Sequence, residues 1–122
     1  MGFKFQEWNV YKEIRKFRKE VIEEIVSKLP KEEQFILISQ LKRALNSSLL
    51  NIAEGAYRKS DKDLAHFLNQ SDTSLNEVVS CFDICLDDGY IDESLHKRFC
   101  KKVEKLTSQL AGFRRFLKKS KE

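Results

Sequence analysis

Hydrophobic residues recur every three or four positions along almost the whole chain, and this period constrains the fold more than any other feature. The first such stripe consists of Val10, Ile14, Phe17, Val21 and Ile25. Intervals of three and four return to the same side of an α-helix, so each stripe is the apolar face of one helix. No segment shows the alternation of apolar and polar residues that is typical of a surface strand. The pattern predicts an all-α protein.

Breaks in this pattern divide the chain into four segments. Pro30 ends the first helix and can begin the next one. Ser60 and Asp63 resemble a capping box, and Gly89 is a natural left-handed stop. The expected helices cover approximately residues 8–29, 31–57, 61–88 and 92–117. Because the links are short, helices that are adjacent in sequence should lie antiparallel. We therefore predict that the chain forms one antiparallel up-and-down four-helix bundle.

Composition supports a soluble, single-domain protein. A chain of 122 residues that is 41% hydrophobic is long and apolar enough to bury one core without metals or disulfides. No run of about 18 apolar residues predicts a membrane span, and the N-terminus lacks the apolar core of a signal peptide. Cys81, Cys85 and Cys100 lie in apolar contexts, which favours free thiols in a reducing compartment. We expect a cytoplasmic protein.

The second expected helix carries more apolar surface than one core can cover. Its core side includes Leu41, Leu45 and Ile52. A second set of residues lies on roughly the opposite side: Ile36, Arg43, Ser47, Leu50, Glu54 and Tyr57. Exposed apolar patches tend to mark interfaces, although scattered surface hydrophobic residues are also common. This set therefore predicts self-association, with scattered surface residues as the alternative.

Charge is distributed unevenly along the chain. Residues 61–92 hold one base and eight acids, whereas residues 93–122 hold ten bases and three acids. The expected third and fourth helices can attract each other as neighbours, or the bases can form a surface for RNA or DNA. The candidate nucleic-acid contacts are Arg58, Lys59, Lys97, Arg98, Lys101, Lys102, Lys105, Arg114, Arg115, Lys118 and Lys119. Exposed aromatic residues among them would favour single-stranded nucleic acid, but the pattern identifies none.

The residues that usually carry chemistry form no recognisable site. Cys81 and Cys85 share a helix face, but zinc needs further ligands, and His66 and His96 are isolated in the sequence. The sequence has no phosphate-binding glycine loop, dinucleotide fingerprint, zinc-protease motif or nucleophile elbow. We therefore predict a protein that is not an enzyme and has no catalytic residues, cofactor or metal site.

A resemblance to a known family adds further expectations. Residues 47–55 read Ser-Ser-Leu-Leu-Asn-Ile-Ala-Glu-Gly, and residues 57–60 read Tyr-Arg-Lys-Ser. Together with residues 29–33 and 86–91, they resemble the four-helix-bundle family of 23S rRNA intervening-sequence proteins, and the likeness extends over approximately residues 3–117. The resemblance implies a bacterial protein that assembles as a homopentameric ring. A similar bundle is the accessory protein of diversity-generating retroelements, which implies nucleic-acid binding.

One departure from the family pattern affects the expected assembly. Family members commonly carry a proline just before the Asn-Ile-Ala-Glu-Gly segment, whereas this chain has Leu49 and Leu50 there. The helix is therefore expected to be straighter, which leaves the oligomer geometry open. Asn51 and Glu54 can either hold the turn between the second and third helices or contact RNA.

Two functions remain open after this reading of the sequence. The first is a ring-shaped homo-oligomer that binds RNA or DNA through basic surfaces. The second is a protein-interaction scaffold or accessory subunit that does not contact nucleic acid directly.

Overall fold

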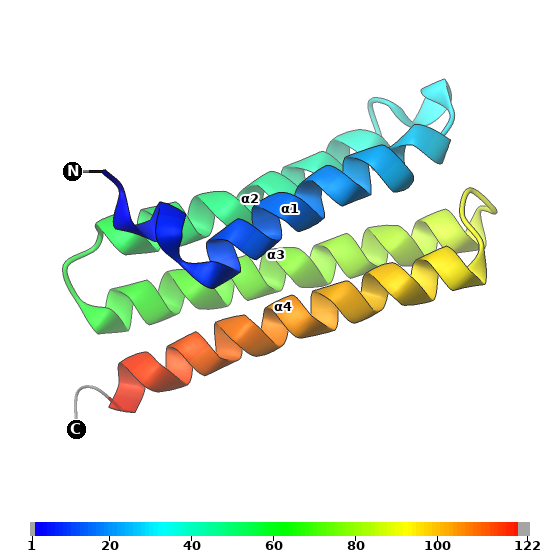
Figure 1. The fold of residues 1–122 in the computed structure, drawn as a ribbon. Coiled ribbons are helices and arrows are strands. Elements are labelled where there is room, and N and C mark those ends of the chain that lie inside the picture. The colour runs from blue at the N-terminus through cyan, green and yellow to red at the C-terminus, as the bar shows by residue number, and fades with distance from the viewer. Residues whose placement is uncertain (1, 120–122) are drawn as a thin grey trace.

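The computed structural model describes residues 2–119, which form four α-helices and, within this range, no strand. The helices are α1 (Asn9–Glu24), α2 (Leu37–Tyr57), α3 (Asp61–Asp87) and α4 (Glu93–Lys119). Successive helices run in opposite directions, and α3 packs against both α2 and α4 (Figure 1). The predicted all-α antiparallel four-helix bundle is confirmed. None of the described helices has the length and apolar character needed to cross a membrane.

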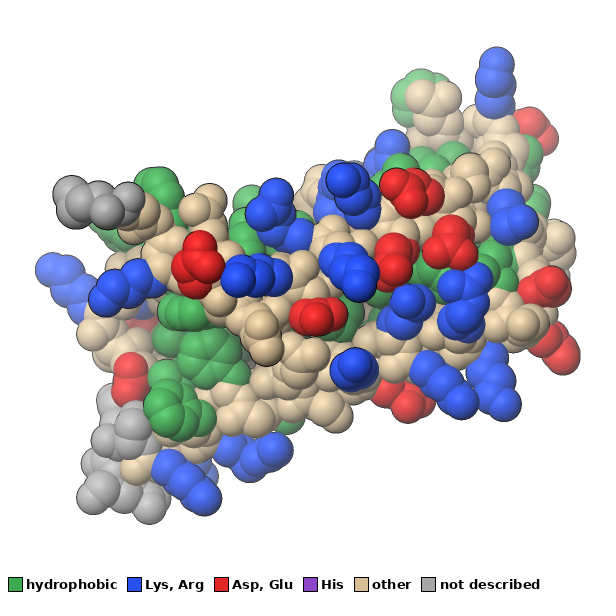
Figure 2. All heavy atoms as spheres, viewed as in Figure 1, with side chains coloured by type: hydrophobic (Ala, Val, Ile, Leu, Met, Phe, Trp, Pro, Cys, Tyr) green, Lys and Arg blue, Asp and Glu red, His purple; other side chains and the backbone are tan. Residues whose placement is uncertain are grey.

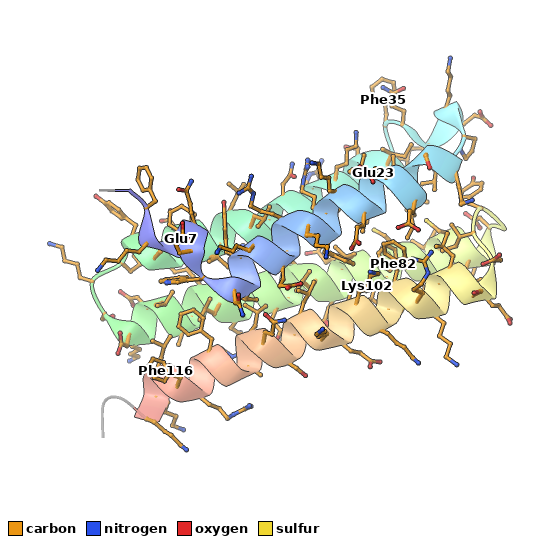
Figure 3. All side chains as sticks on the ribbon, in the orientation of Figure 1. Glu7, Glu23, Phe35, Phe82, Lys102 and Phe116 are labelled. Atoms are coloured by element: carbon orange, nitrogen blue, oxygen red, sulfur yellow. The ribbon has the colours of Figure 1, made fainter. Side chains whose placement is uncertain are left out.

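The predicted apolar stripes meet in one core along the length of the bundle. Within this core, the rings of Phe17, Phe82 and Phe99 come from α1, α3 and α4, with centroids 6.0 to 6.3 Å apart. Figure 3 shows Phe82 inside the bundle. Leu41 and Leu45 of α2 are fully buried beside this cluster. Tilted and edge-on aromatic pairs at these separations add to the free energy of burying the rings.

Small residues line the contact between α2 and α3. The buried Ser71 hydroxyl donates a 2.6 Å hydrogen bond to the Ser48 carbonyl, and the hydroxyls of Ser47 and Ser74 are 2.8 Å apart. Gly55 lies so close to α3 that a Cβ atom there would be 2.8 Å from the Cβ of Phe67. Small side chains let the two helices approach closely, and their hydroxyls are satisfied by hydrogen bonds.

The link between α1 and α2 is longer than the expected helix bounds imply. Helix α1 ends at Glu24, and the chain continues through two 3-10 turns, η2 (Val26–Lys28) and η3 (Lys31–Glu33). Leu29 is extended, as residues before a proline usually are, and α2 begins only at Leu37. Phe35 and Ile36 therefore lie in the link rather than in a helix.

The other helix ends follow the predicted chemistry. The Ser60 hydroxyl accepts a hydrogen bond from the Asp63 amide at the start of α3. Gly89 has a positive φ of 78° after α3, and the Asp92 carboxylate accepts a hydrogen bond from the Leu95 amide at the start of α4. These caps satisfy backbone groups that the helices leave unpaired.

Candidate nucleic-acid interface

Three of the predicted bases on α4 form ion pairs with neighbouring helices. Arg98 contacts Glu24 at 2.8 Å and Lys102 contacts Glu20 at 3.3 Å, both on α1. Arg114 contacts Asp72 of α3 at 3.3 Å. Figure 3 shows Lys102 between α4 and α1. The Arg114–Asp72 pair is the attraction between α3 and α4 that the charge distribution suggests, whereas Arg98 and Lys102 pair with acids of α1 instead.

The hydrogen bond from Arg98 has an electrostatic consequence for its partner. It lowers the pKa of Glu24, because the guanidinium stabilises the ionised carboxylate. The Arg98 guanidinium also lies 5.1 Å from the ring centroid of Phe99. Arg98 therefore contacts both the Glu24 carboxylate of α1 and the Phe99 ring of α4.

The remaining predicted bases of α4 are exposed and form no ion pair within residues 2–119. They are Lys97, Lys101, Lys105, Arg115, Lys118 and Lys119. The intervals from Lys97 to Lys101 and from Lys101 to Lys105 are four residues, so these three side chains follow the outer side of the helix. Such unpaired cations can reach phosphates without breaking a contact between helices.

Two exposed aromatic residues lie at the same end of the bundle as the last of these bases. Tyr57 ends α2 and has 85% of its surface exposed, while Phe116 lies near the end of α4 with 65% exposed. The α2–α3 link and the end of α4 share one end of the molecule (Figure 1), and Phe116 is labelled there in Figure 3. We call this set the basic–aromatic end. Its members are Tyr57, Arg58, Lys59, Arg115, Phe116, Lys118 and Lys119.

Sequence reasoning missed Phe116 and assigned Tyr57 to the oligomer interface rather than to nucleic-acid binding. Phe116 is exposed although the next residue, Leu117, belongs to the core. A helical wheel of α4 that separates Phe116 from Phe113 and Leu117 could have found it. The structure thus supplies exposed rings among the bases, which the sequence pattern did not identify.

The Asn-Ile-Ala-Glu-Gly segment near the end of α2 makes contacts within the subunit. The Asn51 amide donates hydrogen bonds to the carbonyl and hydroxyl of Ser47, at 2.9 and 3.1 Å. Glu54 accepts a 2.6 Å hydrogen bond from Arg58, whose guanidinium lies 4.9 Å from the ring centroid of Phe67. Glu54 thereby helps to connect the α2 end to α3, whereas Asn51 bonds within its own helix. Lys59 is exposed beside them.

A second basic surface lies across α1 and α2 and was not among the predicted contacts. A shallow hollow between these helices is lined by Lys12, Arg15, Lys16, Arg18 and Lys19 of α1, with Asn46 and Leu49 of α2. The Arg18 side chain donates a 2.8 Å hydrogen bond to Asn46, and Figure 2 shows Lys and Arg side chains gathered over the middle of α1. A helical wheel of α1 would have found this surface, because it separates these bases from the acidic residues on the side of α1 that faces α4.

The residues predicted to form the oligomer interface, five on α2 and Ile36 in the link before it, differ in their surroundings. Ile36, Leu50 and Tyr57 are 68%, 67% and 85% exposed, and Arg43 and Glu54 are also exposed. Ser47 is half-buried, because its hydroxyl contacts Ser74 of α3.

Phe35 joins the exposed apolar residues of this side. It is 87% exposed and points away from the bundle in Figure 3. Together with Ile38, Arg43 and Leu50, it lines a shallow groove along the outer side of α2. The structure therefore presents an apolar groove where the sequence predicted an interface.

The cysteines and histidines occupy different environments. Cys81 and Cys85 are buried, and burial raises the pKa of both thiols, that of Cys85 to about 11. His66 is exposed against the ring of Phe67. His96 is not isolated, because its imidazole contacts Asp83 and Cys100 from the α3 and α4 sides. The isolation expected from the sequence is corrected by the pairing of these two helices.

The family model described as 23S rRNA-intervening sequence protein matches residues 6–112. The chain belongs to this family. The family resemblance seen in the sequence is thereby confirmed, and the match covers α1, α2, α3 and most of α4. A search of curated proteins finds no match. The matched region includes the α2–α3 link and the outer bases Lys97, Lys101 and Lys105 of α4. Arg115 and Phe116 lie after its last residue.

Proposed function

We propose that this protein is a non-enzymatic, cytoplasmic homo-oligomer that binds RNA or DNA through the basic–aromatic end and the outer bases of α4. The observation that carries the proposal is the placement of exposed Tyr57 and Phe116 at one end of the bundle among exposed cations, most of which form no ion pair within residues 2–119. Bases of single-stranded nucleic acid stack on exposed rings, while cations follow the phosphates.

The charge distribution supports binding to a polyanion. Lys59, Arg115, Lys118 and Lys119 have no ion pair within residues 2–119 that nucleic acid would have to displace. Lysine and arginine contacts to phosphate release counterions, so the affinity should fall steeply as the salt concentration rises. Arg98, Lys102 and Arg114 should contribute less, because each is already paired with an acid.

The exposed groove of α2 supports homo-oligomerisation. Phe35, Ile36 and Leu50 present large apolar side chains to solvent in the single subunit. Covering these side chains with a second copy would remove apolar surface from water. In the proposed homopentameric ring, the basic–aromatic end would be repeated in every subunit, and linked weak contacts would raise the total affinity.

The binding proposal is tested by fluorescence anisotropy with labelled single-stranded RNA and DNA at increasing salt. Arg115→Glu combined with Lys119→Glu should weaken binding about tenfold or more, and Tyr57→Ala with Phe116→Ala should weaken it at every salt concentration. The matched control is Lys28→Glu with Lys31→Glu, an equal charge change at the opposite end of the bundle. Salt-independent binding, absent binding at low salt, or an equal loss in the control would overturn the proposal.

The assembly proposal is tested by measuring the mass in solution. The wild-type chain should form a homopentamer, and Leu50→Glu should reduce the mass while circular dichroism remains helical. Arg43→Ala is a milder substitution than Leu50→Glu in the same groove of α2. A wild-type protein that is a strict monomer at all concentrations would contradict the proposed assembly.

The same groove favours a second candidate function, that of a scaffold for a protein partner. Its apolar lining by Phe35, Ile38 and Leu50 suits a side chain from another protein as well as one from a second copy. This candidate predicts a specific partner that remains bound after nuclease treatment. If nuclease removes every partner, the scaffold function fails.

A further inference from the structure

Three potential metal-ligand atoms converge between α3 and α4 near the link that joins them. Asp83 belongs to α3, and His96 and Cys100 belong to α4. One ligand atom from each lies within 4.8 Å of the other two. The Nε2 atom of His96 is 2.8 Å from the Asp83 carboxylate and 3.6 Å from the Cys100 sulfur.

The arrangement differs from a catalytic triad built on cysteine and histidine. In such a triad, the nucleophile and the orienting carboxylate contact opposite nitrogens of the imidazole. Here both the carboxylate and the sulfur lie closest to the same nitrogen, Nε2, and Nδ1 is 3.9 Å from the sulfur. Three different donor atoms within 4.8 Å of one another are close enough to share one metal ion.

We propose that Asp83, His96 and Cys100 bind a divalent cation of the zinc class. Zinc bonds of about 2.0 to 2.3 Å in a tetrahedral site place the ligand atoms roughly 3.3 to 3.6 Å apart. The separations of 2.8 and 3.6 Å from His96 Nε2 to the other two ligand atoms are near this range, and no two of the three atoms are more than 4.8 Å apart. Water can fill the fourth position, as in sites with three protein ligands.

The donor set selects among metals. A thiolate, an imidazole and a carboxylate suit zinc, whereas magnesium and calcium prefer oxygen ligands alone. On binding, the Cys100 thiol gives up its proton to solvent, and the thiolate and the Asp83 carboxylate together balance the two positive charges. The bound site is therefore electrically neutral.

Local structure holds the ligands in place before a metal binds. His96 and Cys100 are one turn apart on α4, so their side chains share a flank of that helix. The backbone amide of His96 donates a hydrogen bond to the Asp92 carbonyl. In the α3–α4 link, the backbone amide of Tyr90 donates a hydrogen bond to the Cys85 carbonyl. The cation would connect α3 to α4 across this link, and the stability it adds would grow with the logarithm of its free concentration once that exceeds the dissociation constant.

The experiment uses the full chain, kept reduced, with Co²⁺ as a spectroscopic probe and Zn²⁺ as competitor. One Co²⁺ per chain should bind, with a sulfur-to-cobalt charge-transfer band that Zn²⁺ abolishes, and Zn²⁺ should raise the melting temperature. Cys100→Ser should remove the band, while Asp83→Asn and His96→Gln should weaken binding about tenfold or more. All three positions are at least partly exposed, so the variants should remain folded, and circular dichroism verifies this.

The matched control is His66→Gln, which changes the other histidine outside the cluster. It should leave the Co²⁺ affinity and the band unchanged. The proposal is overturned if no charge-transfer band develops, if Cys100→Ser keeps it, or if His66→Gln weakens binding as much as His96→Gln.

Discussion

The Tyr90 hydroxyl donates a 2.7 Å hydrogen bond to the Glu33 carboxylate and so joins the α1–α2 link to the α3–α4 link. The two residues are 57 positions apart in sequence. The bond to the carboxylate raises the pKa of Tyr90 to about 12 from its ordinary value of 10.0. Partial desolvation and the negative charge of Glu33 act in the same direction. The end of the bundle opposite the termini is therefore closed by a contact that requires a protonated tyrosine.

This bond makes the stability dependent on alkaline pH. Because the folded state raises the pKa, the contribution of Tyr90 is fully present below pH 10 and is lost as the pH rises towards about 12. Wild type should lose more stability over this window than Tyr90→Phe, which has no proton to lose. Denaturant unfolding at several alkaline pH values measures the difference. Parallel pH profiles for the two proteins would contradict the prediction.

Gly55 and Gly112 offer a matched pair of glycine substitutions in helices. In Gly55→Ala, the new Cβ would lie 2.8 Å from the Cβ of Phe67, so the protein should lose about 1 to 3 kcal/mol of stability. In Gly112→Ala, the nearest atom is the flexible end of Arg115 at 3.7 Å, and helix propensity should raise stability by up to about 1 kcal/mol. Thermal and denaturant unfolding check both. Equal effects at the two sites would show that α2 and α3 are not closely packed.

The buried hydroxyl of Ser71 should contribute to the stability of the α2–α3 contact. Ser71→Ala removes its hydrogen bond to the Ser48 carbonyl and should cost about 1 kcal/mol of unfolding free energy. Thr73→Ala on the same helix removes an exposed hydroxyl that bonds only to the Asn69 carbonyl within that helix. The control should change stability by less than about 0.5 kcal/mol. A smaller loss for Ser71→Ala than for Thr73→Ala would refute a role for this bond between the helices.

The three thiols should differ in their reactivity. Cys81 and Cys85 are 1% and 0% exposed, and burial raises the pKa of each, so little thiolate is present or accessible near neutral pH. Cys100 is half-buried, and although burial raises its pKa as well, it should react with iodoacetamide first. Peptide mapping by mass spectrometry, with a chelator present and with or without denaturant, measures the order. Labelling of Cys81 or Cys85 in the folded chain at the rate of Cys100 would contradict it.

Local patterns in the sequence were sufficient to predict the bundle and most of its helix ends. The three-four period identified the buried faces, because it depends only on the rise and turn of a single helix. Ser60 and Gly89 were predicted at helix ends because their side chain or backbone acts on residues within one turn. The start of α2 was placed too early, since Glu32 and Glu33 suit the first turn of an α-helix but here lie in a 3-10 turn.

Contacts between helices were decided only by the tertiary structure. The pairing of Arg98 with Glu24, the convergence of Asp83, His96 and Cys100, and the shared end of Tyr57 and Phe116 depend on how each helix is shifted and rotated against its neighbours. That register is set by the packing of the whole core. A period along one helix determines which side is buried, but it carries no information about which residue of another helix lies opposite.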